Sequence, residues 1–129
     1  MRHFTPKQTH AFLQERADAA LVDCRSEIEY MYVGHPPGAM HVAWQEYPDW
    51  EINQRFADEV LREVGDKLRT VVLICRSGKR TLAAGKMLEE AGFADVINVL
   101  HGFEGDLDDQ MQRNTLNGWR FDGLPWEQM

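Results

Sequence analysis

The feature that most constrains the fold is a short apolar run, Val71–Ile74, which stops at a cysteine and passes through a polar turn into a helix-forming segment. Four consecutive β-branched or aliphatic residues are typical of a buried strand. The turn at residues 75–80 contains a glycine and three cations, and residues 81–92 have helical spacing. A buried strand that runs directly into a helix favours an α/β domain.

Strand and helix patterns alternate along the rest of the chain. Further strands are predicted at residues 20–23, 39–42 and 96–100, and helices at residues 5–16, 26–34, 53–65 and, more weakly, 103–112. The aromatic, turn-rich tail at residues 113–129 is expected to pack back on the body. The sequence therefore predicts a single domain over residues 1–129, with its core at about 5–112. Its mostly parallel sheet should have helices on both faces and ligand sites at the carboxyl ends of the strands.

Composition and charge exclude several functional classes. The chain has 129 residues, with 14 basic and 21 acidic side chains and a net charge of −7, which argues against a nucleic-acid or anionic-membrane partner. No apolar run approaches the roughly 20 residues that cross a bilayer, and no secretory signal is visible, so a cytoplasmic location is expected. Two cysteines are too few for a disulfide scaffold or a structural zinc site. Neither a metal nor another cofactor is predicted.

The cysteine at the end of the central run is the strongest candidate for chemistry. Cys75 lies where a strand passes into a helix, and backbone N–H groups without an intrahelical partner converge at such a junction. Arg76, Lys79 and Arg80 add positive charge to the same loop. Both features favour a thiolate and predict a nucleophilic cysteine in an anion-binding loop. The alternative is that Cys75 is a small buried apolar residue.

Four segments of the chain jointly resemble the rhodanese domain, a sulfurtransferase module. They occur in the family's order and span residues 21–103: LVDCR at 21–25 with Glu29 and Tyr30, GHPPGAMH at 34–41, CRSGKR at 75–80, and VLHGF at 99–103. The Cys-Arg-x-Gly-x-Arg loop is more similar to the thiosulfate type than to the mercaptopyruvate type. The chain departs from the family pattern at Pro36, Cys24 and His101, where isoleucine, valine and glycine are usual.

The resemblance implies both a fold and a reaction. The fold is a three-layer α/β domain with a central, mostly parallel five-stranded sheet. The reaction transfers a sulfane sulfur from a small anionic donor, such as thiosulfate, through a Cys75 persulfide to a thiol or cyanide, or to a sulfur-relay protein. The persulfide would be surrounded by the loop residues Arg76, Ser77, Gly78, Lys79 and Arg80. Inward-pointing amides of this loop would stabilise its negative charge.

Two other functions fit the same fold. A cysteine-dependent phosphatase or arsenate reductase would hold a tetrahedral oxyanion in a slightly larger loop. Four residues separate Cys75 from Arg80, whereas the cysteine-phosphatase signature has five. A non-catalytic rhodanese-like binding module is the third hypothesis, and the presence of Cys75 argues against it.

The roles of the neighbouring polar residues remain open at the level of sequence. Arg80 could contact the donor or brace the loop through a carboxylate, whereas Arg76 and Lys79 are the candidates for facing the substrate. Asp23 and Arg25 could support the loop or form a structural ion pair. His101 could be a turn residue or a substrate contact. Cys24 is expected to be a buried strand residue, with a second redox cysteine as the alternative. The four tryptophans are expected to anchor the core and tail.

Overall fold

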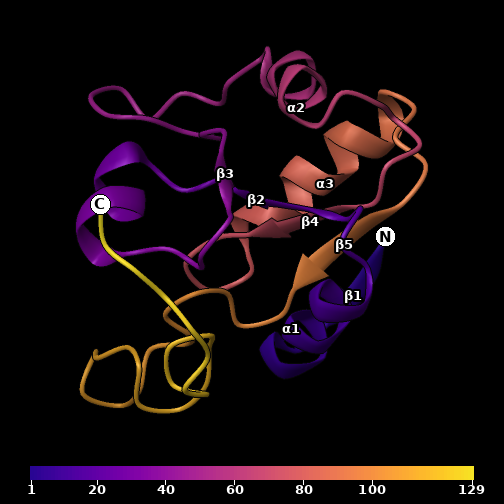
Figure 1. The fold of residues 1–129 in the computed structure, drawn as a ribbon. Helices are drawn as coiled ribbons and strands as arrows, with labels where there is room; N and C mark the ends of the chain where they lie inside the picture. Colours follow the sequence, from indigo (N-terminus) through magenta and orange to yellow (C-terminus); the bar gives the residue numbers. More distant parts are fainter.

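Five parallel strands form one sheet through the middle of the molecule (Figure 1). The computed structural model describes all of residues 1–129. The strands are β1 (Arg2–Phe4), β2 (Ala20–Asp23), β3 (Met40–His41), β4 (Val71–Ile74) and β5 (Val96–Val99), in the order β1-β5-β4-β2-β3. The helices are α1 (Pro6–Glu15), the π-helix η1 (Glu29–Val33), α2 (Phe56–Val64) and α3 (Arg80–Glu90). The predicted α/β fold is confirmed, and every pairing is parallel.

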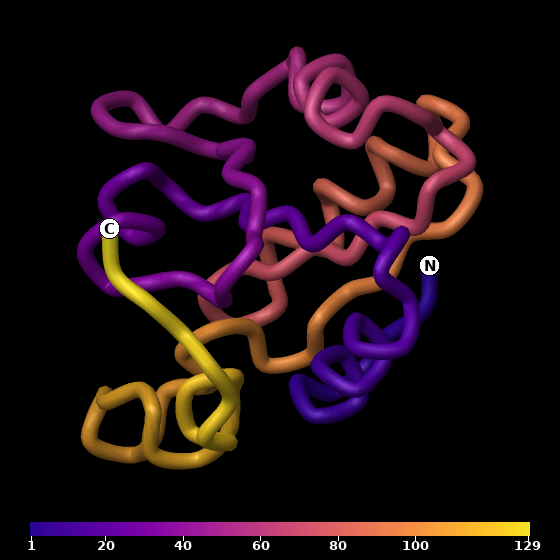
Figure 2. Tube along the Cα trace, in the orientation of Figure 1, coloured from indigo at the N-terminus to yellow at the C-terminus, as the bar shows by residue number.

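Helices and connecting segments cover both faces of this sheet. Figures 1 and 2 show α2 and α3 on one side and α1 with the C-terminal segment on the other. The first layer contributes Phe56, Val60 and Leu88 to a core cluster that includes Val22 and Leu73 of the sheet. The opposite layer packs on a second core. This core consists of the alternate strand residues together with two aromatic side chains: Leu21, Val72, Ile74, Ile97, Val99, Phe103 and Trp119. The three-layer arrangement follows from strands that are apolar on both faces.

Local sequence signals place the helix boundaries. Thr5 caps α1 through a capping box with Gln8, and Pro6 is the first helical residue. Gly65 ends α2 in the left-handed conformation, with φ of 86°. The helix predicted between Ser26 and Gly34 is present, but it is wound as a π-helix. The helix predicted from residue 53 begins at Phe56.

Two features were not predicted correctly. The strand β1 was missed, because three residues that include Arg2 and His3 at the edge of a sheet carry little apolar pattern. The weak helix predicted over residues 103–112 is wrong, since this stretch forms turns. Its backbone instead bonds to the cysteine loop: the Phe103 N–H donates to the Cys75 carbonyl at 2.8 Å, and the Glu104 N–H donates to the Arg76 carbonyl at 2.9 Å.

The C-terminal segment packs back on the body across η1. Trp119 is buried, and its indole N–H donates to the Pro125 carbonyl at 2.7 Å. His35 and Glu127 form an antiparallel bridge with two backbone hydrogen bonds of 2.9 Å. In Figure 2 the last residues run beside the indigo-to-purple segment that contains η1. None of the helices combines the length and the apolar sequence that a membrane span requires.

The strand order places a crevice between β4 and β2. From β2 the chain proceeds to β3 on one side, whereas from β4 it proceeds to β5 on the other side. Connections that diverge in this way leave an opening at the carboxyl ends of the two strands, which is where ligands bind in open α/β sheets. The residues that follow these two strands are Cys24 and Cys75.

Candidate active site

Cys75 lies at the base of a tight loop between β4 and α3. The Gly78 N–H donates to the Cys75 sulfur over 3.1 Å, and the Thr81 hydroxyl oxygen lies 3.5 Å from the same sulfur. Cys75 is 1% exposed. No side chain caps the N-terminus of α3, and the Gly78 N–H of the preceding turn donates to the cysteine sulfur.

These contacts lower the pKa of Cys75 well below that of a free cysteine. The largest cause is the Cys24 side chain, whose S–H can donate to a Cys75 thiolate, and burial acts in the opposite direction. Thr81 and the positive charge of Arg80 lower the pKa further. Cys24 has the reverse behaviour: its proximity to Cys75, together with burial, raises its pKa. The site therefore favours a Cys75 thiolate beside a protonated Cys24.

Gly78 and Gly102 allow two backbone segments to approach each other. Gly78 has φ of 92°, and a Cβ atom at this position would lie 3.1 Å from the His101 nitrogen and 3.2 Å from the Val99 oxygen. A Cβ atom on Gly102 would lie within van der Waals overlap of the Cys75 and Arg76 backbone. The turn after β5 thus supports the cysteine loop from behind.

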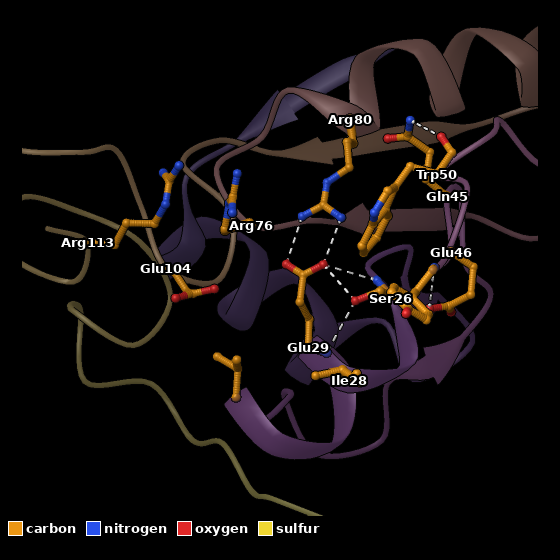
Figure 3. A pocket seen from close by; sticks show the side chains of 12 residues that line it. Ser26, Ile28, Glu29, Gln45, Glu46, Trp50, Arg76, Arg80, Glu104 and Arg113 are labelled. Atoms are coloured by element: carbon orange, nitrogen blue, oxygen red, sulfur yellow. Dashed lines mark hydrogen bonds and ion pairs between the residues drawn. The ribbon is translucent and has the colours of Figure 1, made fainter. Parts of the chain in front are cut away.

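Arg80 is held by a carboxylate. Its two terminal nitrogens each donate to one oxygen of Glu29 over 2.9 Å, and Ser26 also contacts Glu29 (Figure 3). Burial alone would raise the pKa of Glu29, but the hydrogen bonds and charge of Arg80 outweigh this effect and lower the pKa to about 2. The guanidinium is therefore fixed in one orientation beside the loop.

An open cleft of about 780 Å³ lies beside the loop. Figure 3 shows Arg76, Glu104 and Arg113 on one side of it and Gln45, Glu46 and Trp50 on the other, with Arg80 and Glu29 between them. The exposed residues Ile28, Tyr47 and Trp50 add an apolar rim. The cleft thus offers both signs of charge and an apolar contact surface.

The loop cations occupy different positions. Arg76 is exposed and lines the cleft, and Arg80 lines it while bound to Glu29. Lys79 is also exposed, but it is not among the residues that line the cleft. Ser77 is half-buried in the turn between them. Of the two cations expected to face the substrate, Arg76 is therefore the better placed.

Asp23 and Arg25 form a fully buried ion pair with each other. Arg25 also donates to the Gly34 carbonyl and stacks over the Phe103 ring at 4.5 Å. These contacts join β2, η1 and the turn after β5, which is a structural arrangement. The backbone of His101 lies against the loop, but its ring lies 3.4 Å from Asp106 and is not among the cleft-lining groups.

Three residues near the sulfur were not identified from the sequence as parts of the site. Glu29 was named only as part of the first family-like segment, without a role at the site. Thr81 and Asn98 were not singled out, although Asn98 interrupts an apolar strand and a buried amide requires partners. The Thr81 hydroxyl donates to Asn98, and the Asn98 amide nitrogen lies 3.2 Å from His3 Nδ1.

Comparison with known proteins places this geometry in a family. A rhodanese-like domain model matches residues 5–108. The chain is 32% identical over 114 residues to an uncharacterised protein of Rickettsia conorii, covering 85% of this chain and 84% of that protein. It is 32% identical over 115 residues to the thiosulfate sulfurtransferase GlpE of Actinobacillus pleuropneumoniae, covering 89% and 83% of the two chains.

A solved structure shows the same fold over the full length. The crystal structure of Rv0390 from M. tuberculosis matches with a TM-score of 0.87 and 37% identity, covering 100% of this chain and 98% of that one. Fold and loop together define a parallel α/β domain with a cysteine at the carboxyl edge of its central strand. The chain belongs to the rhodanese-like domain family.

Proposed function

We propose that the protein is a thiosulfate-type sulfurtransferase that carries a sulfane sulfur as a persulfide on Cys75. The observation that carries this proposal is the geometry of the loop. One amide and one hydroxyl group converge on the Cys75 sulfur, within a loop that reaches Arg80 after four residues. The lowered pKa of Cys75 supplies the thiolate that such a reaction requires. The similarity to a protein named thiosulfate sulfurtransferase supports the same assignment.

The reaction divides into two displacements at sulfur. First, the Cys75 thiolate attacks the outer sulfur of thiosulfate, a new S–S bond forms, and sulfite departs with the electron pair of the broken S–S bond. Second, a thiolate or cyanide attacks the outer sulfur of the persulfide and expels the Cys75 thiolate. No net oxidation of the protein occurs, and the free thiolate is regenerated.

The residues around the sulfur suit these steps. Arg76, at the cleft, provides positive charge for the sulfonate oxygens of the donor, while Glu29 holds Arg80 beside the loop. The Gly78 N–H can donate to the charged sulfur without the reorganisation that water would need. The cleft is large enough for a thiol acceptor that is bulkier than cyanide, including a cysteine on a sulfur-relay protein.

Intact-mass analysis tests this function. Incubation with thiosulfate is expected to add the mass of one sulfur atom to the wild-type protein but not to a Cys75→Ser variant. The thiosulfate:cyanide reaction should be faster than hydrolysis of an aryl phosphate. Sulfur uptake by Cys75→Ser would contradict the assignment, and faster phosphate hydrolysis would favour a phosphatase.

A further inference from the structure

The two cysteines of the chain lie opposite each other on neighbouring strands. In the register of β2 and β4, Val22 pairs with Leu73 and Asp23 pairs with Ile74. The pairing continues past the strand ends, because the Cys24 N–H donates to the Ile74 carbonyl over 3.0 Å. The next position in this register places Cys24 beside Cys75. Neighbouring strands lie about 4.8 Å apart, which is within the range of Cα separations that a disulfide can bridge.

Their side chains point to the same face of the sheet. Side chains alternate between faces along a strand, and Cys24 and Cys75 belong to one core cluster together with Val22 and Leu73. The residues at the alternate positions of these strands, Leu21, Val72 and Ile74, belong to the core on the opposite face. Both thiols are free and buried, at 0% and 1% exposure. Each thiol is therefore shielded from solvent and has the other thiol as its neighbour.

We infer that Cys24 is a resolving cysteine, which attacks the Cys75 persulfide and discharges its outer sulfur as hydrosulfide. This inference rests on the proposed function, because it requires a loaded Cys75. It adds an activity to sulfur transfer: the reductive release of a sulfane sulfur when no external acceptor is present. The product is a protein with a buried Cys24–Cys75 disulfide, which cannot accept sulfur until a reductant restores both thiols.

The step balances without a further oxidant. The Cys24 sulfur bonds to the inner sulfur, Cys75 Sγ, while the bond between Sγ and the outer sulfur breaks. The outer sulfur leaves with the bonding electron pair and takes the proton of Cys24, so that Cys75–S–S⁻ and Cys24–SH give the disulfide and HS⁻. The sulfane sulfur is reduced to the oxidation level of sulfide, and the two cysteines are oxidised to the disulfide.

The surroundings of Cys24 favour attack on the inner sulfur. The inner sulfur is Cys75 Sγ, which lies in the same core cluster as Cys24 and next to it in the register of β2 and β4. Cys24 must give up its proton to become the attacking thiolate, and the outer sulfur, which departs as HS⁻, is the group that takes this proton. Burial of Cys24 and of Cys75 Sγ shields the inner sulfur from thiols in solution, whereas the proposed sulfur transfer takes place at the outer sulfur.

The experiment compares the lifetime of the persulfide in two variants with that in the wild-type protein. Because Cys24 also lowers the pKa of Cys75, wild-type protein, Cys24→Ser and Cys24→Ala are reduced and loaded with thiosulfate at an alkaline pH that ionises Cys75 in all three. They are then desalted to remove donor and reductant, and the fraction that has taken up sulfur is followed by intact mass and by a sulfide assay. Serine retains a hydrogen-bonding group of similar size, and alanine avoids a buried hydroxyl, so that one variant reports if the other folds poorly. Circular dichroism checks the fold of both.

The wild-type protein is expected to lose the added sulfur, to end two hydrogen masses lighter than its reduced form, and to release one sulfide for each sulfur lost. Peptide mapping without reductant should join the Cys24 and Cys75 peptides. The variants should keep the added sulfur at least about tenfold longer, and the wild-type decay should not depend on protein concentration. Equal persulfide lifetimes, or decay without the disulfide, would overturn the inference while leaving the proposed function intact. Failure of every protein to take up sulfur would instead contradict the proposed function.

Discussion

Arg80 and Glu29 are joined by two hydrogen bonds of 2.9 Å, and the pair connects the first residue of α3 to the first residue of η1. The two side chains come from opposite sides of the crevice between β4 and β2, 51 positions apart in sequence. They are only 21% and 18% exposed. The orientation of the cysteine loop therefore depends on a residue from a different part of the chain.

Acid should weaken the folded state through Glu29. Its pKa of about 2 lies below the ordinary value of 4.5, so its stabilising contribution is complete above pH 4.5 and is lost as the pH falls toward 2. The free energy of unfolding should decrease across this interval by about 2–3 kcal/mol more in the wild type than in Glu29→Gln. Chemical denaturation at several pH values measures this difference. Glu63→Gln, at an exposed position of α2, is the matched control and should retain the wild-type pH dependence.

Removal of the Thr81 hydroxyl should raise the pKa of Cys75. Thr81 lowers that pKa, and its single hydroxyl proton, which points at the buried Asn98 oxygen, can turn to the sulfur 3.5 Å away when Cys75 is a thiolate. Thr81→Val removes this proton from both acceptors. The pH at which iodoacetamide alkylation of Cys75 reaches half its maximum rate should increase. Stability should fall by about 1–3 kcal/mol. Thr81→Ser keeps the hydroxyl and should behave like the wild type; an equal pKa increase in both variants would show that the methyl group, not the hydroxyl, matters.

Gly78→Ala should disrupt sulfur loading more than its backbone strain alone explains. Its added Cβ would meet the backbone of Val99 and His101 at 3.1–3.2 Å, and the Gly78 N–H that donates to sulfur would move. Gly38 has a similar φ of 79° with open space around it, so Gly38→Ala isolates the strain. We expect the Gly78→Ala variant to be less stable than the Gly38→Ala variant by roughly 1 kcal/mol or more. It should also accept little sulfur from thiosulfate in the intact-mass measurement. Equal losses in both variants would remove the loop contact as the cause.

Arg76 should contribute more to donor binding than Lys79. Arg76 lines the cleft, whereas Lys79 is exposed outside it. We expect Arg76→Ala to raise the KM for thiosulfate by roughly tenfold, the effect of losing one charge-assisted hydrogen bond, and Lys79→Ala to change it by less than about threefold. Steady-state kinetics of the thiosulfate:cyanide reaction provides both constants. A larger effect at Lys79 would place the donor on the other side of the loop.

Local patterns predicted the parts of the fold that short apolar runs specify. The strands around Val22, Leu73 and Ile97 are buried on both faces, and such strands have a continuous apolar sequence. The edge strand β1 has no such pattern, since its residues are partly exposed and its position depends on pairing with β5. The segment after Phe103 has apolar residues at near-helical spacing, but its backbone groups bond to the cysteine loop instead.

Of the candidate site, the sequence predicted the contiguous loop but not the distant residues that contact it. The loop from Cys75 to Arg80 is contiguous in sequence, so its charge and its glycine were visible there. The partners of this loop are distant in sequence: Glu29, Asn98 and Cys24 reach it through strand order and register, which local patterns do not specify. Only the complete sheet brings them together.

The bridge between His35 and Glu127 affects the order in which the protein can mature. A growing polypeptide that ends near residue 105 already contains all five strands and the cysteine loop. The segment around η1, which contains Glu29, still lacks its contacts with Glu127 and Met129 at that stage, because these residues are synthesised after the strands. Assembly of the sheet can therefore precede the packing of residues 127–129 against the cleft wall, at a site whose nucleophile is already in place.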